Sequence, residues 1–447
     1  MKNFYELLAE KARLRPTHLC IVEDESALPY GELLHYADKL AEKLPAKKGD
    51  AVLVLADTFT RQAAAFFAAQ KKGARPILLH HGLAPEEESA IFKERSLQGF
   101  WRVSESNESY EAQDVPQSFI DNDDCLGVLT SGSTGTPKVM YRTYRSWAEF
   151  FPVQNEIFGV DENARMFLHG SLSFTGNMNS FLSVLYAGGT TITGSKLRVR
   201  SWASLMRARR ANILYLVPAK LRLLAAEKEP FPDVLSLFTG SQTVSEKLLS
   251  QLAKLLPNAR VTLYYGASEL NYITYTMLDA DAPRNPDNLG KPFPGVGLSV
   301  QDGKIYVNTA YHVSGVEIPF TVGDEGHLNG AGELIFKGRG DAYINKGGFK
   351  ISATRVENLL RELPGIAAAV VLPFADEARG EESAAFLVRE ENADETEIRR
   401  TLPKVLKPVE MPRRIVFLEE IPLNDRGKPD KKLLWKIANK KATESQE

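Results

Sequence analysis

The sequence predicts an α/β fold: a large N-terminal domain of mostly parallel sheets covered by helices, with a β-rich subdomain, and then a small mobile α+β C-terminal domain. Helical and apolar strand-like segments alternate in the first 80 residues and again after residue 200. Turn residues crowd between short β-like runs around residues 286–340. The chain has 447 residues, roughly three times a common domain length, so at least two domains are expected.

The N-terminal segments show the alternation most clearly. Residues 30–44 carry apolar side chains at helical spacing, and residues 50–56 form an apolar run typical of a buried strand. Residues 60–72 are rich in alanine and end before Gly73, which suits a helix C-cap. Residues 75–79 form the next short strand. Helices that alternate with apolar strands indicate βαβ units and a mostly parallel sheet.

The same alternation returns in the middle of the chain. The predicted helices are 201–211, 218–227 and 245–256, and the predicted strands are 213–217, 234–238 and 260–264. Glycines then separate β-like runs such as 304–307 and 333–336, which predicts the β-rich subdomain.

An α+β pattern resumes beyond this glycine-rich region. It contains a helix near 353–362 and strands near 367–372 and 384–388. We place the boundary at about Asp341, which gives a large domain of residues 1–340 and a small domain of residues 341–447, close to the common domain size.

Composition narrows the class of protein. Hydrophobic residues make up 43% and charged residues 25%, which is typical of a globular chain. The formal net charge of −2 gives no field that would attract nucleic acid or anionic lipid. Cys20 and Cys125 are too few for a disulfide framework and lack metal-ligand spacing, so we expect buried thiols in a reducing compartment. With no signal-peptide pattern and no apolar run near ~20 residues, we expect a cytoplasmic enzyme.

The first chemical signal is the loop Leu129-Thr-Ser-Gly-Ser-Thr-Gly-Thr-Pro-Lys138, which follows an apolar strand-like run. Glycines let backbone N–H groups approach an anion, hydroxyls add donors, and the lysine adds charge, so the loop has the parts of a phosphate cradle. It is not a Walker A loop, because Pro137 and Val139 stand where that motif needs Gly and Ser or Thr. From composition alone, a polar surface loop is an equal alternative.

This loop resembles the signature loop of the adenylate-forming (AMP-binding) superfamily, which includes acyl- and aryl-CoA synthetases, peptide-synthetase adenylation domains and luciferases. Four further elements resemble those of the family, in its order. They are Tyr265-Gly-Ala-Ser-Glu269, Gly323-Asp324, the hinge-like segment 338–351 with Glu357 beyond it, and Pro422-Leu-Asn-Asp-Arg-Gly-Lys428. The resemblance therefore spans nearly the whole chain.

The resemblance implies a role for each element. The ring of Tyr265 would pack on adenine, the Ser268 hydroxyl would meet the α-phosphate, Glu269 would hold Mg²⁺, and Asp324 would accept the ribose hydroxyls. The catalytic residues would be Lys428, Glu269, Lys138 and Ser268. The other implied nucleotide-binding residues are Thr130, Ser131, Gly132, Ser133, Thr134, Gly135, Gly240, Ser241, Gln242, Gly266, Ala267, Arg339 and Lys350. Asp341 would be the hinge, and Gly347 and Gly348 would line a tunnel for a pantetheine thiol.

The reaction implied by the resemblance has two steps. A carboxylic acid is first activated as acyl-AMP by ATP and Mg²⁺ with release of pyrophosphate, and the acyl group then passes to the thiol of coenzyme A. The alternative acceptor is the phosphopantetheine arm of an acyl or aryl carrier protein, loaded by a stand-alone adenylation enzyme. The expected partners are thus a small carboxylic acid and one of these thiols, with no nucleic acid and no membrane span.

The acid pocket is expected from residues 171–178, 240–242 and 267–271, by the family layout. Phe174, Asn177 and Asn271 suggest an aromatic wall with amide hydrogen-bonding groups, which suits an aromatic or a short to medium acyl acid. The large domain is also compact, which is more similar to aryl-acid and o-succinylbenzoate activating enzymes than to long-chain synthetases.

Several residues depart from the family pattern. Val139 follows Lys138 where Gly is usual, Lys350 stands where many relatives have Arg, and Ser268 replaces Thr. His169 lies several residues before the position of the family's pocket histidine, so we interpret it as a core histidine. His80 and His81 are predicted to lie in a strand and to point to opposite faces, so they are not expected to chelate a metal together.

Each element also has a structural alternative. Asp324 could be a turn residue, Glu269 a helix cap, Lys428 a solvated lysine and Arg339 a member of a surface ion pair. Two other classes of protein fit the sequence less well. A conventional nucleotide hydrolase or kinase lacks support because the Walker spacing is missing. A non-catalytic adenylate-binding scaffold is disfavoured because Glu269, Asp324 and Lys428 are all present.

Overall fold

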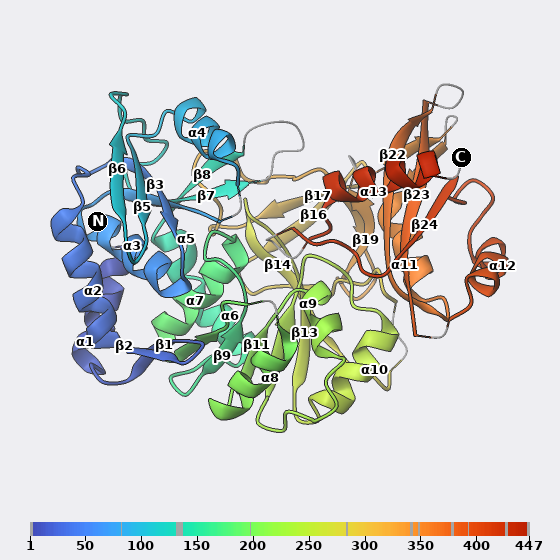
Figure 1. The fold of residues 1–447 in the computed structure, drawn as a ribbon, viewed down its shortest axis with the longest axis horizontal. Coiled ribbons are helices and arrows are strands. Elements are labelled where there is room, and N and C mark those ends of the chain that lie inside the picture. Colours follow the sequence, from blue (N-terminus) through green and yellow to red (C-terminus); the bar gives the residue numbers. More distant parts are fainter. Residues whose placement is uncertain are drawn as a thin grey trace.

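A computed structural model of the chain describes residues 3–81, 83–130, 137–196, 198–282, 285–339, 343–346, 349–376, 380–391, 393–424 and 428–444, with the side chains of 339, 343, 345, 349, 350, 375, 380 and 439–444 left out. Figure 1 shows a large body that runs from blue to yellow and a smaller orange and red body beside it.

The first sheet of the large body has six strands in the order β6-β5-β3-β4-β7-β8. Its four central strands are parallel, and the two edge strands are antiparallel to their neighbours. The strands are β3 (Ala51–Ala56), β4 (Arg75–Leu79), β5 (Gly99–Val103), β6 (Glu108–Ala112), β7 (Asp124–Thr130) and β8 (Lys138–Thr143). The nearby helices are α1 (Phe4–Leu14), α2 (Tyr30–Lys43), α3 (Phe59–Lys71) and α4 (Pro85–Glu94).

The second sheet has nine strands in the order β15-β14-β13-β12-β11-β9-β10-β1-β2. The six strands from β13 to β1 run parallel, whereas β14, β15 and β2 are antiparallel to their neighbours. The strands are β1 (Leu19–Glu23), β2 (Ser26–Pro29), β9 (Arg165–Leu168), β10 (Thr190–Thr193), β11 (Ile213–Tyr215), β12 (Ser236–Thr239), β13 (Arg260–Ala267), β14 (Asn271–Leu278) and β15 (Lys291–Pro292). Its helices are α5 (Arg145–Ala148), α6 (Phe151–Phe158), α7 (Thr175–Ala187), α8 (Val199–Ala208), α9 (Pro218–Leu224) and α10 (Glu246–Leu255).

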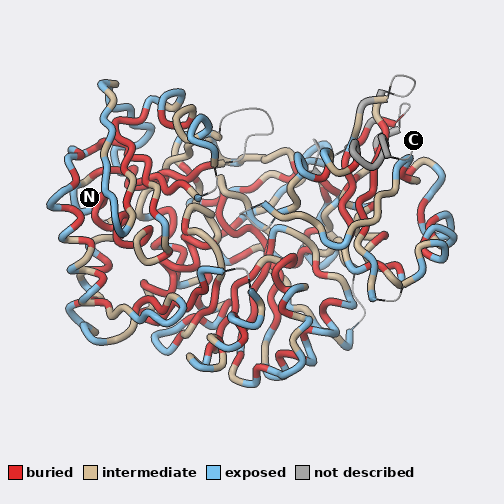
Figure 2. Tube along the Cα trace, in the orientation of Figure 1, coloured by how far each residue is buried: buried red, intermediate tan, exposed pale blue. Residues whose placement is uncertain are grey.

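Helix α3 is buried on every side, because it lies between the two sheets. Residues 62–70 are all buried, and most of them are alanine. Small side chains let neighbouring layers approach closely, and the larger Phe59 and Phe67 meet Phe181 of α7 with ring centroids 5.5 and 6.2 Å apart. Figure 2 shows the resulting buried core running through the large body.

The β-rich subdomain is an antiparallel sheet of β16 (Gly297–Gln301), β17 (Lys304–Asn308), β18 (Asp324–Leu328) and β19 (Leu334–Arg339). The small domain follows. Its sheet is β20 (Tyr343–Lys346), β21 (Phe349–Ser352), β22 (Ile366–Asp376), β23 (Gly380–Arg389) and β24 (Arg414–Leu418), with α11 (Ala353–Arg361), α12 (Glu395–Val405) and α13 (Lys431–Glu444). Two hydrophobic clusters of its own hold it together, and Lys346 pairs at 2.9 Å with the fully buried Glu382.

The structure confirms the predicted fold class and most of the predicted elements, with shifts of a few residues at their ends. The position of the boundary at 340/341 stays a prediction, because residues 340–342 lie outside the description. Among the described residues, no helix is long and apolar enough to cross a membrane. The cytoplasmic location remains an expectation from the sequence.

Three local predictions were wrong. The strand predicted over 260–264 continues to Ala267, so Tyr265 lies within it rather than after it. The segment after Glu269 is strand β14 and not a helix, which excludes the helix-cap alternative for Glu269. His80 and His81 follow β4 rather than lying in it, because the apolar run that forms the buried strand ends at Leu79.

Candidate active site

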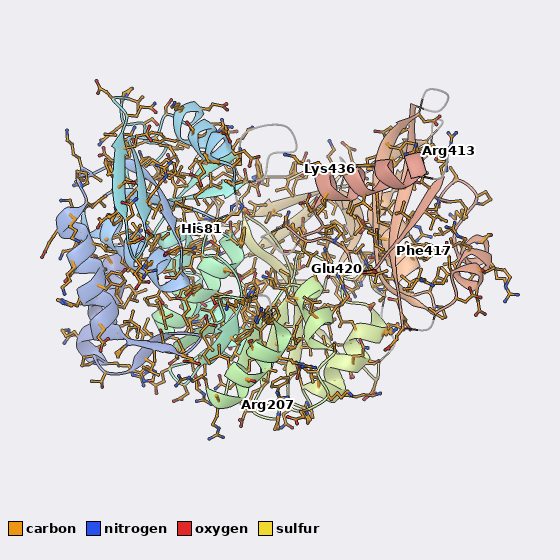
Figure 3. All side chains as sticks on the ribbon, in the orientation of Figure 1. His81, Arg207, Arg413, Phe417, Glu420 and Lys436 are labelled. Atoms are coloured by element: carbon orange, nitrogen blue, oxygen red, sulfur yellow. The ribbon has the colours of Figure 1, made fainter. Side chains whose placement is uncertain are left out.

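A cavity of about 300 Å³ lies where strands of the second sheet end, beside the start of helix α7. In parallel α/β sheets, ligands bind at the carboxyl ends of the strands. Lys428 reaches this cavity from the small domain; Glu420, labelled in Figure 3, marks the chain just before the segment that carries it. The predicted site residues that line the cavity are Thr130, Phe174, Asn177, Ser241, Gly266, Ala267, Ser268, Glu269, Asn271, Asp324 and Lys428.

Asp324 lines the cavity, and Tyr265, assigned to adenine, does not line it but contacts Asp324 from beside it. The hydroxyl of Tyr265 on β13 donates a hydrogen bond of 2.5 Å to Oδ2 of Asp324, which begins β18. The ring of Tyr265 packs against Phe336, with centroids 5.7 Å apart. Asp324 is 7% exposed and follows Gly323, whose φ of +85° is accessible mainly to glycine. The tyrosine ring and the carboxylate are therefore fixed relative to one another before any ligand binds.

Glu269 lies in the three-residue turn between β13 and β14. The backbone carbonyl of Glu269 accepts a hydrogen bond of 2.8 Å from the N–H of Val313. The Ser268 hydroxyl lies 3.4 Å from that of Thr175, the first residue of α7. These contacts place the Glu269 carboxyl at the cavity.

Arg142 holds the Ser268–Glu269 turn by hydrogen bonds. The sequence analysis did not identify this residue. The side chain of Arg142 is fully buried, and its guanidinium donates to the carbonyl of Ser268 at 2.6 Å and to that of Tyr311 at 3.1 Å. Burial lowers the pKa of Arg142 to about 9, against the opposing attraction of Glu269. The arginine thus stays charged at neutral pH, close to the carboxylate assigned to the metal.

The opposite end of the cavity is walled by aromatic and amide side chains. Asn177 is buried in the first turn of α7, and its Nδ2 donates to the carbonyl of Ser171 at 3.0 Å. The hydroxyls of Tyr215 and Tyr264 lie 3.0 Å apart. A Cβ at Gly176 would collide with the Tyr215 hydroxyl, so this position requires glycine. The two tyrosines therefore form one connected part of the cavity wall.

Lys220 lines the cavity and is another residue that the sequence analysis missed. It lies in the first turn of α9, is 6% exposed, and donates from Nζ to the carbonyl of His169 at 2.8 Å. Burial lowers the pKa of Lys220 to about 8. The His169 ring packs on Trp202 at 4.5 Å, as expected of a core histidine, but it also lines the cavity. Burial and the charge of Lys220 lower the pKa of His169 to about 3, so its imidazole is neutral.

Other predicted residues lie beside the cavity or outside the description. Lys138 is exposed at the start of β8, where it pairs with Thr130 across the ladder. Gln242 accepts from Arg222 at 3.4 Å, and a Cβ at Gly240 would meet the Tyr264 ring. The predictions for Ser131, Gly132, Ser133, Thr134, Gly135, Asp341, Gly347 and Gly348 fall on residues outside the description, as do the side chains of Arg339 and Lys350.

The residues present fit a magnesium ion held jointly with phosphate. Among the described residues there is no group of three or more His, Cys, Asp or Glu that could hold a metal by itself. Mg²⁺ is usually bound through one or two carboxylates together with substrate phosphates. Glu269, with the Ser268 hydroxyl beside it, offers the protein side of such a site.

Contacts between the domains keep Lys428 at the cavity. The Thr243 hydroxyl donates to Oδ1 of Asn358 on α11 at 2.8 Å, and Lys247 pairs with Glu390. Lys428 is held by Asn424: the N–H of Lys428 donates to Oδ1 of Asn424, and the carbonyl of Lys428 accepts from the Asn424 N–H. The structure therefore has the domain orientation that presents Lys428 to Glu269 and Asp324.

Comparison with known proteins places this geometry in a family. The family model described as AMP-binding enzyme matches residues 91–338, and the model for the C-terminal domain of these enzymes matches residues 355–428. An uncharacterised acyl-CoA ligase, YhfT of Bacillus subtilis, is 28% identical over 67% of this chain and 66% of its own length. The vibriobactin-specific 2,3-dihydroxybenzoate-AMP ligase of Vibrio cholerae is 25% identical over 97% of this chain and 93% of its own.

Solved structures agree on the fold. o-Succinylbenzoate CoA synthetase of Bacillus subtilis, in complex with its acyl-adenylate intermediate, has a TM-score of 0.79 at 19% identity, covering 96% of this chain and 97% of that one. ATP-bound MatB of Rhodopseudomonas palustris has a TM-score of 0.80 at 20% identity, covering 96% and 98%. A further structure of the Bacillus synthetase contains ATP and a magnesium ion. Because a family model matches more than half of this chain, the chain belongs to the AMP-binding enzymes, which confirms the predicted adenylate-forming (AMP-binding) family.

Proposed function

We propose that this chain activates a carboxylic acid with ATP as an acyl-adenylate, releases pyrophosphate, and transfers the acyl group to the thiol of coenzyme A. One observation carries the proposal: Lys428 of the small domain and Glu269 and Asp324 of the large domain line the same cavity. A nucleotide-binding scaffold without catalysis has no need of a lysine presented by a second domain.

The first step needs positive charge around the phosphorus under attack. A carboxylate is a poor electrophile, and joining it to AMP gives it a good leaving group. The Lys428 ammonium can contact both the acid carboxylate and the α-phosphate, which orients the attack and stabilises the charge that develops. Mg²⁺, when bound, supplies neutralising charge to the phosphate oxygens, and Glu269 is the residue that would hold it.

The residues at the nucleotide end can bind both the base and the ribose of a nucleoside. The Tyr265 ring, fixed by Phe336 and Asp324, offers a flat face to the adenine base. Asp324 offers carboxylate oxygens to ribose hydroxyls, and a ribose there would compete with the Tyr265 hydroxyl for Oδ2. Arg142 keeps the Ser268–Glu269 turn in place during the step.

The second step is assigned to a rotated small domain. Asp341 is the proposed pivot, and Gly347 and Gly348 are the proposed lining of the thiol tunnel. Domain rotation is supported by the polar contacts between the domains, Thr243 with Asn358 and Lys247 with Glu390, which can break and reform. A carrier protein is the alternative acceptor, and the similarity to the 2,3-dihydroxybenzoate-AMP ligase supports keeping it.

An acid panel tests the proposal directly. The purified chain is incubated with ATP, Mg²⁺, labelled pyrophosphate and one carboxylic acid at a time. We expect acid-dependent exchange of label into ATP, and thioester formation when coenzyme A is then added. Release of ADP and phosphate, or ATP binding without exchange for every acid, contradicts the proposal. Exchange without transfer to coenzyme A, but with transfer to a phosphopantetheine carrier, favours the alternative acceptor.

A further inference from the structure

Lys220 is a buried cation that faces a ligand cavity. Among the described residues, its one hydrogen-bond partner is the backbone carbonyl of His169, and no carboxylate forms an ion pair with it. The His169 ring beside it is neutral, and its protonation would only add positive charge. Burying an ammonium without a counter-ion is costly, and proteins usually pair such groups. The missing counter-ion can come from a bound ligand.

Two amide groups on the cavity wall add donors without acceptors. Asn179 is 2% exposed and accepts from Gln154 at 2.9 Å, but its Nδ2 has no partner among the described residues. Asn271 is 7% exposed, has a left-handed φ of +66°, and likewise has an Nδ2 with no partner in the described ranges. Buried donors are normally satisfied, so the occupant of this wall should bring acceptors.

The walls of the cavity do not suit a long alkyl chain. Lys220 and Lys428 line the same cavity of about 300 Å³, together with the hydroxyls of Tyr215 and Tyr264, which lie 3.0 Å apart. An acid that reaches both lysines between these polar walls is short and carries polar groups.

We infer that the acid is a short dicarboxylic acid, whose second carboxylate is bound by Lys220 while the first reacts beside Lys428. The inference rests on the proposed function and narrows its substrate class. The second carboxylate supplies the counter-ion that Lys220 lacks, and its oxygens are acceptors for amide donors such as those of Asn179 and Asn271. A monocarboxylic acid of the same length would leave these donors unpaired.

The test compares matched acids on matched variants. Pyrophosphate exchange is measured with succinate against butyrate, glutarate against pentanoate, and isophthalate against benzoate. The variants are the unmodified chain, Lys220→Met, Lys220→Arg, and Lys228→Met as a control. Lys228 is exposed just beyond the same helix, so its loss removes one charge without touching the cavity.

We expect kcat/KM to favour one dicarboxylic acid over its monocarboxylic partner by at least about tenfold in the unmodified chain. Lys220→Met should abolish most of this ratio, Lys220→Arg should keep part of it, and Lys228→Met should keep it in full. Because each ratio is taken on one protein preparation, partial unfolding of a variant does not change it.

Three results would overturn the inference. The first is pyrophosphate exchange that is equal for both acids of every pair, or faster with the monocarboxylic acid. This result would contradict a dicarboxylic substrate but leave the proposed function intact. If Lys220→Met keeps the dicarboxylic-to-monocarboxylic ratio of kcat/KM, Lys220 does not bind the second carboxylate. If that variant loses only thioester formation, Lys220 acts on the thiol arm instead. No exchange with any acid overturns the proposed function itself.

Discussion

The two ends of the cavity are built in contrasting ways. At the nucleotide end, the polar groups already contact one another: Tyr265 donates to Asp324, and Arg142 holds the Ser268 carbonyl. At the acid end, Lys220 has one backbone acceptor, and the Nδ2 atoms of Asn179 and Asn271 have no partner among the residues described.

This difference in hydrogen bonding indicates which kind of ligand each end of the cavity binds. A ligand that the whole family shares can be bound by side chains that are already fixed in place. This lowers the entropic cost of ordering these side chains on binding. A ligand particular to one member must supply whatever its own pocket lacks. The unpaired donors therefore carry more information about the acid than the family motifs do.

The largest effect is expected at Glu269. Glu269→Gln removes the negative charge assigned to Mg²⁺ and should slow adenylate formation about a hundred- to thousandfold, the typical cost of one preorganised charged contact. Pyrophosphate exchange at saturating acid measures it. Glu156→Gln on the exposed face of α6 is the control and should exchange normally. Near-normal exchange in Glu269→Gln would remove this carboxylate from the nucleotide end.

A smaller effect is expected at Arg142, which acts through the turn. Arg142→Lys replaces a planar fork with a point charge that cannot reach the carbonyls of Ser268 and Tyr311 together. We expect about a tenfold higher Mg²⁺ concentration for half-maximal exchange, because the Glu269 carboxyl is less well held.

The matched control for this change is Arg145→Lys, an exposed arginine paired with Glu149 in the next turn of chain. Thermal unfolding of both variants is measured alongside. If Arg142→Lys lowers the melting temperature but leaves the Mg²⁺ dependence unchanged, Arg142 is structural only.

The smallest effect is expected at Tyr265. Tyr265→Phe keeps the ring but removes the hydrogen bond to Asp324, and hydrogen bonds to charged groups contribute roughly 1.5–3 kcal/mol. Because ribose hydroxyls replace part of that bond, we expect KM for ATP to rise only about threefold to tenfold, with KM for the acid unaffected. Tyr306→Phe on β17 is the control. An equal rise in KM for the acid would contradict the separation of the two ends.

The nucleotide end could be predicted from sequence because its residues occur in short motifs. Tyr265, Ser268 and Glu269 are neighbours along one strand and its turn, and Asp324 follows a glycine in a turn. The regular elements were predictable for a similar reason, since burial imposes a period of 2 or 3.6 on apolar residues. Even there, the extension of β13 to Ala267 was missed, because Gly266 interrupts the apolar pattern.

The acid end could not be predicted in the same way. Lys220 and Arg222 are the charged residues of an otherwise apolar segment, and a lysine at the start of a helix has no spacing that marks it as buried. Arg142 is equally isolated within an aromatic run. Their burial results from strands and helices far away in the chain, so only the folded structure brings Lys220 to His169 and Arg142 to Ser268.

The central claim is that Lys428 is brought into the cavity by the small domain for adenylation alone. The direct measurement is both half-reactions on Lys428→Ala, with Lys431→Ala at the exposed start of α13 as the control. Pyrophosphate exchange should fall about a hundred- to thousandfold, whereas chemically made acyl-adenylate should be converted to thioester at close to the normal rate. Equal loss of both half-reactions would contradict the account and make Lys428 a general binding residue.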